Sequence, residues 1–431
     1  MKIKPWQAFE SKNKYTYEEP ISRMKIIYFT LFALVSIVVL AAADQYLFCP
    51  FYTFTDTKVF AGDSIYNPYA SALPGDWIKC NFHAHVHCWG GVTNGCGTAS
   101  YANHIYNGLH YGVHAISNYQ SIDTSSNRLP GYITSYEHGY NMRKNHQLVL
   151  GADKICWRDY LLPQTINNKQ DILNHLSVDT NSLVIINHPL VRNAYSSNDF
   201  KYLTNYNCME VLSPSCISTC LWDAALSNGK PVFIVGNDDV HNIYDSNKVG
   251  RICTWINVTA LNKTNILNAL RTGNSYGMII GKEVVLEERR TKNINLPALQ
   301  SLIMNGNTMT VKLSQPAKDI VISGKYGKIL YEVHATDSAV YTLGIHEPYA
   351  REVAIYNDGT QLFLNPIFRQ NAQELAQAPV SMNGNKTLFY RVIGIIVLVF
   401  WFSIMRKLAF RKSKTKKEFL QDDVNLIYEL I

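Results

Sequence analysis

The sequence predicts an α/β domain followed by a small antiparallel β-sandwich, with a membrane-spanning helix at each end. From residue 77 to about 283, short apolar runs alternate with helical stretches, which is typical of an α/β barrel or a layered sheet. From 284 to 370 the segments are short, alternate between apolar and polar residues, and are separated by turn signals, which favours the sandwich. Uncharged apolar runs at 26–43 and 392–405 flank this body.

Both apolar runs have the composition of membrane helices. The first, 26–43, has close to the roughly 20 residues that cross a bilayer. The second reaches a spanning length as 388–405 if Arg391 extends its charge to the membrane surface. A signal peptide cleaved after Ala41-Ala42-Ala43 is the alternative for the first run, and a buried core helix is the alternative for the second.

The net charge of +7 is concentrated at the two ends of the chain. Residues 1–25 hold six Lys or Arg against three Glu, and residues 406–431 hold seven against four Asp or Glu. Apart from Arg391, the rest of the chain is electrically balanced, which argues against a nucleic-acid partner and leaves the lipid bilayer as the expected one. Cations outside both apolar runs predict cytoplasmic termini and an extracytoplasmic body.

Nine cysteines fit an exported domain only loosely. The odd number leaves at least one thiol without a partner in the same chain. We expect mostly buried free thiols with one or two disulfides, for which Cys88–Cys96 and Cys216–Cys220 are the pairs closest in sequence.

Polar side chains follow the predicted strands of the α/β region. Runs at 115–117, 148–150, 183–186 and 232–235 each end in Asn, His, Gly or Asp. Residues directly after such strands lie where barrels place their active sites. The sequence therefore predicts a functional site built from several strand ends.

Histidines and carboxylates at these ends have the pattern of metal ligands. His83 and His85, in a segment that also contains His87, stand two residues apart and would share one face of a strand. Later strand ends supply further candidates, namely Glu137, His146, His188, Asp239 and His241. Imidazole and carboxylate ligands together suit Zn²⁺, Mn²⁺ or Fe²⁺.

In this order, H-x-H, Glu, His, His-Pro and Asp-x-His resemble the PHP (polymerase and histidinol phosphatase) superfamily over roughly residues 77–280. The resemblance implies a distorted, TIM-like (βα)7 barrel with two or three metals that hydrolyses phosphoesters. It assigns His83, His85, Glu137 and Asp239 to the first metal, Glu137, His146 and His188 to the second, and His241 to a third.

The chain departs from the family pattern at two motifs. After H-x-H the sequence continues with Cys88-Trp89, and Ser117-Asn118-Tyr119 stands where the family usually has Thr-Asp-His. A third metal site would retain His241 but lack the other ligands that the family usually supplies. We therefore predict two divalent ions rather than three.

Five further residues are candidates for binding or proton transfer. Arg192 and Arg251 could contact phosphate in a bidentate manner, although structural salt bridges would also explain them. His87 and Tyr119 are candidates for protonating the leaving group. Asp238 is a candidate for orienting a ligand or moving a proton, with a helix N-cap as the alternative.

The sequence thus predicts a membrane-anchored, metal-dependent phosphoesterase that hydrolyses a phosphorylated small molecule or a phosphodiester with a metal-activated water. Two alternatives remain. One is a non-catalytic receptor or scaffold that keeps the fold. The other is an amide or ester hydrolase with the same dinuclear centre, since the fold does not determine the scissile bond.

Overall fold

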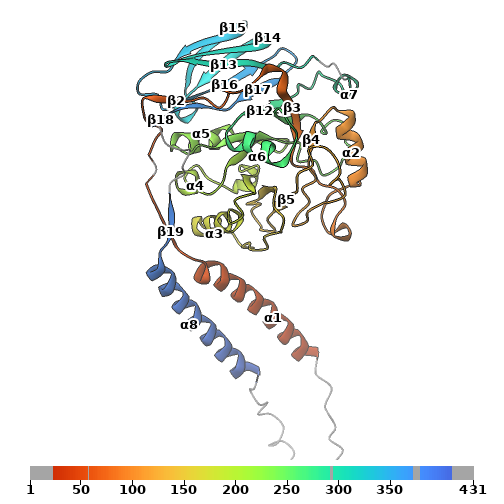
Figure 1. Ribbon diagram of the computed structural model, residues 1–431. Helices are drawn as coiled ribbons and strands as arrows, with labels where there is room; N and C mark the ends of the chain where they lie inside the picture. The colour runs from red at the N-terminus through yellow and green to blue at the C-terminus, as the bar shows by residue number, and fades with distance from the viewer. Residues whose placement is uncertain (1–22, 57, 292–294, 372–378, 410–431) are drawn as a thin grey trace, which may run out of the picture.

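The computed structural model describes residues 23–56, 58–291, 295–371 and 379–409 (Figure 1). Most of the two predicted basic tails, 1–22 and 410–431, lies outside the described residues. Within them, a body built on two large sheets stands at one end of two long helices (Figure 1). A small sheet of β1 (Tyr52–Phe54) and β19 (Val380–Met382) joins the segments that lead to these helices.

The first large sheet has six strands in the order β10-β8-β7-β6-β5, with β9 beside β8. Strand β8 is parallel to both β7 and β10, whereas β6 is antiparallel to both β5 and β7. The strands are β5 (Ser135–His138), β6 (Gln147–Leu150), β7 (Leu183–Ile186), β8 (Cys208–Ser213), β9 (Cys216–Ile217) and β10 (Phe233–Gly236). Their connections contain α3 (Ile166–Leu176), α4 (Asp199–Tyr202) and α5 (Thr219–Ser227).

The second large sheet has eleven strands, with the main order β13-β14-β16-β17-β12-β11-β3-β4. Strand β15 pairs with β14, and β18 pairs with β16 and β2. The strands are β2 (Ser64–Tyr66), β3 (Trp77–Asn81), β4 (Val113–His114), β11 (Ile252–Asn257), β12 (Ser275–Ile279), β13 (Leu299–Asn305), β14 (Thr308–Ser323), β15 (Ile329–Thr342), β16 (Tyr349–Ile355), β17 (Gln361–Leu364) and β18 (Ile367–Gln370). Helices α2 (Ala99–Gly108), α6 (Lys263–Arg271) and α7 (Leu286–Arg289) accompany them.

The predicted (βα)7 barrel is wrong, because the two sheets do not close into one. A barrel needs successive parallel strands joined by crossovers of a dozen or more residues. Here β5 and β6 are antiparallel with only a short loop between them, and β11 and β12 are antiparallel as well. At the sheet edges, one isolated bridge joins Tyr119 to Glu137, and side-chain bonds of Thr254 reach Gly236 on β10. The alternating pattern located strands but did not determine their directions.

The predicted separate β-sandwich is also wrong. Strands β13 to β18 are antiparallel, in keeping with their alternating sequence. However, β17 pairs along its whole length with β12, so these strands continue the sheet that contains β3 and β11. The alternation revealed which face of each strand is buried, but not which sheet the strand joins.

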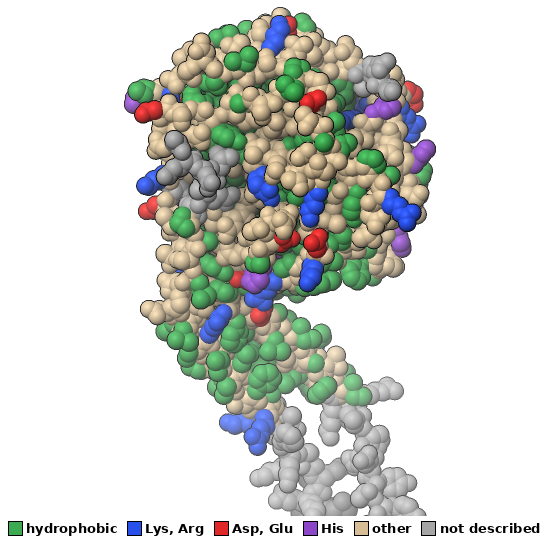
Figure 2. Space-filling model, in the orientation of Figure 1, with side chains coloured by type: hydrophobic (Ala, Val, Ile, Leu, Met, Phe, Trp, Pro, Cys, Tyr) green, Lys and Arg blue, Asp and Glu red, His purple; other side chains and the backbone are tan. Residues whose placement is uncertain are grey.

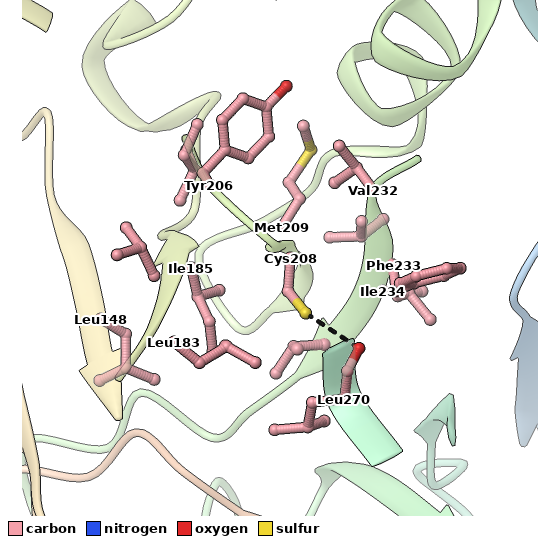
Figure 3. Packing of buried hydrophobic residues seen from close by; sticks show 14 of the residues in the cluster. Leu148, Leu183, Ile185, Tyr206, Cys208, Met209, Val232, Phe233, Ile234 and Leu270 are labelled. Atoms are coloured by element: carbon pink, nitrogen blue, oxygen red, sulfur yellow. Dashed lines mark hydrogen bonds between the residues drawn. The ribbon is translucent and has the colours of Figure 1, made fainter. Parts of the chain in front are cut away.

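The core of the first sheet is formed by strands that are apolar on both faces. Figure 3 shows Leu148, Ile185, Cys208 and Ile234 packed together, with the Cys208 Sγ atom 3.5 Å from the Leu270 carbonyl oxygen on α6. A strand that is buried on both faces has a continuous apolar sequence, as β7 does (LVII). This packing fixes the strand ends from which the candidate site is built.

All nine cysteines lie within the described residues, and all are free thiols there. Cys96 and Cys220 are exposed, whereas Cys49, Cys80, Cys208 and Cys253 are buried. The expectation of buried thiols holds for these four. Neither Cys88–Cys96 nor Cys216–Cys220 forms a disulfide in the described structure.

Helices α1 (Arg23–Ala43) and α8 (Gly384–Ala409) extend from the same end of the body (Figure 1). They contact each other through Phe32 and Trp401, whose rings stack at 5.5 Å, and the Trp401 indole donates to Ser36 Oγ at 3.2 Å. The windows long and apolar enough to span a membrane are Ile26–Phe48 and Gly384–Lys407, each only 6% buried. Figure 2 shows hydrophobic side chains covering this helical region. The second helix is therefore not a buried core helix.

Glu352 on β16 gives the stability of the protein a specific pH dependence. Its side chain is 1% exposed, and neither carboxylate oxygen has a hydrogen-bond partner among the described residues. Burial raises the pKa of Glu352 to about 8. Between its unfolded pKa and pH 8 the folded state holds a proton that the unfolded state loses, so stability falls as pH rises through this window.

We expect the Glu352→Gln variant to lack this pH dependence. Relative to this variant, the wild type should lose about 2–3 kcal/mol of unfolding free energy between pH 5 and pH 7, at roughly 1.4 kcal/mol per pH unit. Urea denaturation of the detergent-solubilised chain at both pH values measures the difference. Equal slopes for the variant and the wild type would show that Glu352 is ionised in the folded protein.

Candidate metal centre

The candidate ligands meet because several strand ends lie at one edge of the first sheet and its neighbour. His188 follows β7 and Asp239 follows β10, two strands that both run parallel to β8. Since β6 is antiparallel to β7, its first residues lie beside the last residues of β7, which places His146 at the same edge. The Asn187 amide donates to the His146 carbonyl oxygen at 3.1 Å and fixes this register.

Glu137 on β5 lies between two groups of histidines. Its Oε2 atom is 3.3 Å from His83 Nε2 and 3.1 Å from His85 Nε2. Its Oε1 atom is 2.9 Å from His146 Nδ1 and 3.1 Å from His188 Nε2. The carboxylate thus faces both pairs of imidazoles and could contribute one oxygen to each group.

Asp239 completes the first group. Its Oδ1 atom is 3.3 Å from His83 Nε2 and 3.6 Å from His85 Nε2. Among the described residues, three sets of three offer ligand atoms within 4.8 Å of one another. Two of them lie at this site, namely His83, His85 and Asp239, and Glu137, His146 and His188, whereas the third, Asp319, Glu332 and His334, lies on β14 and β15. Six of the seven residues predicted as metal ligands are therefore brought together.

The donor atoms fit divalent cations. Glu137 Oε2 and Asp239 Oδ1 are buried and make no hydrogen bond among the described residues. The Nε2 atoms of His83 and His85 lie 3.1 Å apart and face the same space. Buried carboxylate oxygens and imidazole nitrogens that converge in this way are the ligands that Zn²⁺, Mn²⁺ and Fe²⁺ bind.

The carboxylates and His146 have the protonation states that bind metal, whereas His83, His85 and His188 would release a proton on binding it. Burial alone would lower the pKa of these three histidines, but Glu137 and Asp239 raise it. Burial alone would raise the pKa of Glu137, but His146 and His83 hold it well below its usual range. Burial likewise opposes ionisation of Asp239, whose pKa is lowered by His83 and His85. Burial lowers the pKa of His146. Anionic carboxylates and a neutral imidazole are the forms that bind metal.

Two of the ligands have an unusual backbone conformation. His188 and Asp239 have φ angles of 24° and 42°, in a region that residues other than glycine rarely adopt. Such conformations cost on the order of 1–3 kcal/mol each and tend to cluster at functional sites. At both positions the chain turns sharply after a strand and directs the side chain toward Glu137 or His83.

Glu210 on β8 supports the centre and was missed by sequence reasoning. It is fully buried, and its Oε1 atom is 2.9 Å from His83 Nδ1, which leaves Nε2 of that ring directed at the site. Its two oxygens also accept from the Asn237 side-chain amide at 2.9 Å and from the His188 backbone amide at 3.1 Å. The feature of the sequence that could have indicated Glu210 is that it is the one carboxylate in the mostly apolar strand CMEVLS.

Replacing Glu210 by Gln should weaken metal binding without removing a ligand. Carboxylates that hold a ligating histidine typically contribute about 10- to 100-fold to metal affinity. We expect a decrease of that size, measured by competition with a chromophoric chelator at fixed pH. An unchanged affinity would mean that the Glu210–His83 contact does not position the ring.

His241 and Tyr119 lie beside the centre. The His241 ring stands 4.3 Å from the His85 ring, and its Nε2 atom is 3.3 Å from the Tyr119 hydroxyl. Its Nδ1 atom is 3.0 Å from the backbone oxygen of Asp239. Burial, and to a lesser extent the charge of His85, lowers the pKa of His241 to about 4. His241 belongs to neither ligand group in the described structure, so its assignment to a third metal gains no support.

Three predicted residues do not point into the centre. The Asp238 carboxylate accepts from the backbone amides of Gly250, Arg251 and Ile252, so it holds that loop. The Arg251 guanidinium donates to carbonyl oxygens, including those of Gly281 and Val284. His87 is exposed, and β3 ends at Asn81, so His83, His85 and His87 all lie beyond the strand that was predicted to hold them.

A cavity of about 700 Å³ adjoins the second ligand group. His146 and Tyr119 line it next to the centre, and Lys144 and Arg192 add two cations. The remaining lining residues are Trp89, Val92, Thr93, Asn94, Gln120, Gly139, Tyr140, Asn141 and Trp157. The volume is that of a typical small-molecule site. Of the two predicted phosphate-binding arginines, Arg192 alone lines this cavity.

Comparisons with known proteins identify no family for this chain. No family model matches it, and no curated protein has significant similarity to it. Among solved structures, PsfC from Pseudomonas syringae PB-5123 matches with 11% sequence identity and a TM-score of 0.31, over 44% of this chain and 88% of PsfC. A similarity this weak carries no argument about function. The resemblance to the PHP superfamily thus depends only on the ordered ligand residues.

Proposed function

We propose that this protein is a membrane-anchored, metal-dependent phosphoesterase. The observation that carries the proposal is the position of Glu137 between two buried ligand groups, next to a cavity with two cationic side chains. The order of the ligands along the chain, shared with the PHP superfamily, supports the same reaction. The open two-sheet fold gives no independent support for that kinship.

The residues of this chain have separate roles in the proposed reaction. His83, His85 and Asp239 would hold one divalent cation, His146 and His188 a second, and Glu137 would contact both. Two such cations would supply Lewis-acid activation of water and neutralisation of phosphate charge. Lys144 and Arg192 bind and orient the phosphate from the cavity wall. The Tyr119 hydroxyl, which lines the same cavity, can donate a hydrogen bond to the leaving-group oxygen.

The proposed orientation has the body outside the cytoplasm and both termini inside. Arg406 and Lys407 in the last turn of α8 support it, as do the basic residues at the chain ends. Cys96 and Cys220 are exposed on the body and serve as reporters. A membrane-impermeant maleimide should label them in intact cells. Labelling only after permeabilisation would show that the body lies on the cytoplasmic side, opposite to the proposed orientation.

The function is tested with the full chain purified in detergent. After treatment with a chelator, it is assayed on p-nitrophenyl phosphate and bis(p-nitrophenyl) phosphate with and without Mn²⁺ or Zn²⁺. We expect metal-dependent hydrolysis of at least one substrate, and its loss in His146→Ala and Asp239→Ala. His104→Ala, which removes an exposed histidine, is the matched control and should be unaffected. No turnover, together with less than one bound metal per chain, would overturn the proposal.

A further inference from the structure

The mouth of the cavity carries exposed apolar side chains. Trp89, Val92, Tyr140 and Trp157 line the cavity and are also exposed at the surface, Val92 by 89% and Trp157 by 57%. Met142 and Leu161 extend this surface, and the Met142 amide donates to the Leu161 carbonyl oxygen at 3.0 Å. We call these six residues the apolar rim. Contiguous apolar surface beside a cavity commonly marks contact with a membrane or another molecule.

The apolar rim is fixed directly to the end of the first membrane helix. The Gln45 side chain, only 2% exposed, donates to the carbonyl oxygens of Leu162 and Pro163 at 2.8 and 2.9 Å and accepts from the Leu162 amide at 2.7 Å. The Tyr46 hydroxyl donates to the same Pro163 oxygen at 2.8 Å. The segment from Trp157 to Pro163 therefore connects the cavity mouth to the residues that directly follow α1.

The lengths of the helices place this connection at the membrane surface. The uncharged run 26–43 is about 27 Å long at roughly 1.5 Å per residue, close to the hydrocarbon thickness of a bilayer. The first charged residue after it is Asp44, which lies 3.4 Å from Arg158 in the rim segment. On α8, the Arg391 guanidinium donates to the Phe48 carbonyl oxygen at 3.2 Å, and Tyr390 stacks on Phe51 at 4.3 Å. Aromatic and basic residues of this kind anchor helices at the headgroup level.

The arrangement of the body agrees with this placement. In Figure 1, α3 and β5 lie at the end of the body from which α1 and α8 extend, and β13, β14 and β15 lie at the opposite end. Glu137 of the metal centre belongs to β5. Cations accompany the rim, since Arg143, next to Met142, is exposed and Lys144 and Arg192 line the cavity. Positive charge next to apolar surface complements an anionic lipid headgroup.

We propose, building on the phosphoesterase function and on helices that cross the membrane, that the substrate is a phosphate-bearing lipid in the same bilayer. The apolar rim contacts the membrane surface, and the headgroup phosphate enters the cavity between Lys144 and Arg192. The oxygen of water forms a bond to phosphorus, and the phosphoester bond to the alcohol breaks. The alcohol oxygen takes up a proton from the water. The acyl chains of the lipid remain in the bilayer.

The test compares a lipid with its soluble counterpart. The full chain is reconstituted in phosphatidylcholine vesicles that contain phosphatidic acid (a monoester) or phosphatidylglycerol (a diester). Hydrolysis is compared with that of glycerol 3-phosphate and glycerophosphoglycerol at matched concentrations, and p-nitrophenyl phosphate and bis(p-nitrophenyl) phosphate report on the centre itself. We expect at least one vesicle lipid to be hydrolysed about 10-fold or more faster than its soluble counterpart.

Leu161→Gln tests the rim, and Ile303→Gln is the matched control. Leu161 does not line the cavity, so the variant should hydrolyse the soluble probe normally but the vesicle lipid about 5- to 10-fold more slowly, through lost burial of one apolar side chain. Ile303 is equally apolar and exposed on β13, far from the helices in Figure 1, and its variant should match the wild type on both substrates.

The two proposals fail in distinguishable ways. If the soluble probes are hydrolysed, but lipids are turned over no faster than their soluble counterparts, the lipid proposal is overturned and the phosphoesterase function stands. Equal effects of Leu161→Gln and Ile303→Gln on the lipid rate would also overturn the role of the rim. If neither the soluble probes nor the lipids are hydrolysed with Mn²⁺ or Zn²⁺ present, the phosphoesterase function fails and the lipid proposal fails with it.

Discussion

Glu137→Gln should reduce metal-dependent phosphoester hydrolysis by about 1,000-fold or more, equivalent to roughly 4 kcal/mol of transition-state stabilisation. Glu137 faces four imidazoles with its two oxygens, so an amide at this position removes a negative charge from both ligand groups at once. The amide group also directs a donor toward one of these groups. Initial rates on the more reactive p-nitrophenyl ester, at saturating Mn²⁺ or Zn²⁺, measure the effect.

A carboxylate outside the centre provides the control for this variant. Glu287 is exposed on α7, and Glu287→Gln makes the same chemical change there. It should leave both hydrolysis and metal content unchanged. If Glu137→Gln keeps more than a tenth of the wild-type rate and binds the same amount of metal, Glu137 does not join the two ligand groups.

Arg351→Met should destabilise the protein by about 3–5 kcal/mol, because it leaves the Asp223 carboxylate buried without its counter-ion. Arg351 on β16 donates from Nε and Nη2 to the two Asp223 oxygens, both at 2.7 Å, and both side chains are buried. Asp223 belongs to α5. This ion pair therefore connects the helices of the first sheet to the C-terminal strands of the second.

The effect is measured as the shift in the urea midpoint of tryptophan fluorescence for the full chain in detergent. Lys312→Met is the matched control, since Lys312 contacts Asp337 at 2.6 Å in a partly exposed pair that water screens. It should leave the midpoint unchanged. Equal midpoints for Arg351→Met and the wild type would show that the buried pair contributes nothing net to the stability of the fold.

The ligand set could be predicted from sequence because local geometry determines it. His83 and His85 stand two positions apart in the sequence, and His188 and Asp239 each follow a strongly apolar strand. The end of such a strand defines where the next side chain lies to within a residue or two. The adjacent residues Asp238 and Asp239 were harder to assign, because successive side chains point in opposite directions and either could have faced the centre.

The fold could be predicted less well because strand direction and sheet membership are long-range properties. The apolar run at 148–150 has the same appearance in a parallel strand and in an antiparallel one. The partner of β17 is β12, more than 80 residues earlier in the chain, and no local pattern specifies that pairing. Glu210 was missed for a related reason, since its contact with His83 spans 127 residues.

The membrane assignment also depends on contacts that the sequence does not reveal. Composition identified the two apolar helices and the basic ends. The bonds of Gln45 to Leu162 and Pro163 appear only in three dimensions, and they are what place the cavity mouth beside the end of α1. Net charge and hydropathy alone thus indicate apolar helices, whereas the tertiary contacts show that the cavity mouth lies beside the end of one of them.

The most direct test of the central claim is the number and position of the bound ions. Crystals or single particles of the full chain, grown or prepared with Zn²⁺ or Mn²⁺, would locate them, and elemental analysis would count them. We predict two ions per chain, one contacting His83, His85 and Asp239 and one contacting His146 and His188, both touching Glu137. A chain that binds less than one ion at saturating metal, or binds its ions away from Glu137, would contradict the account.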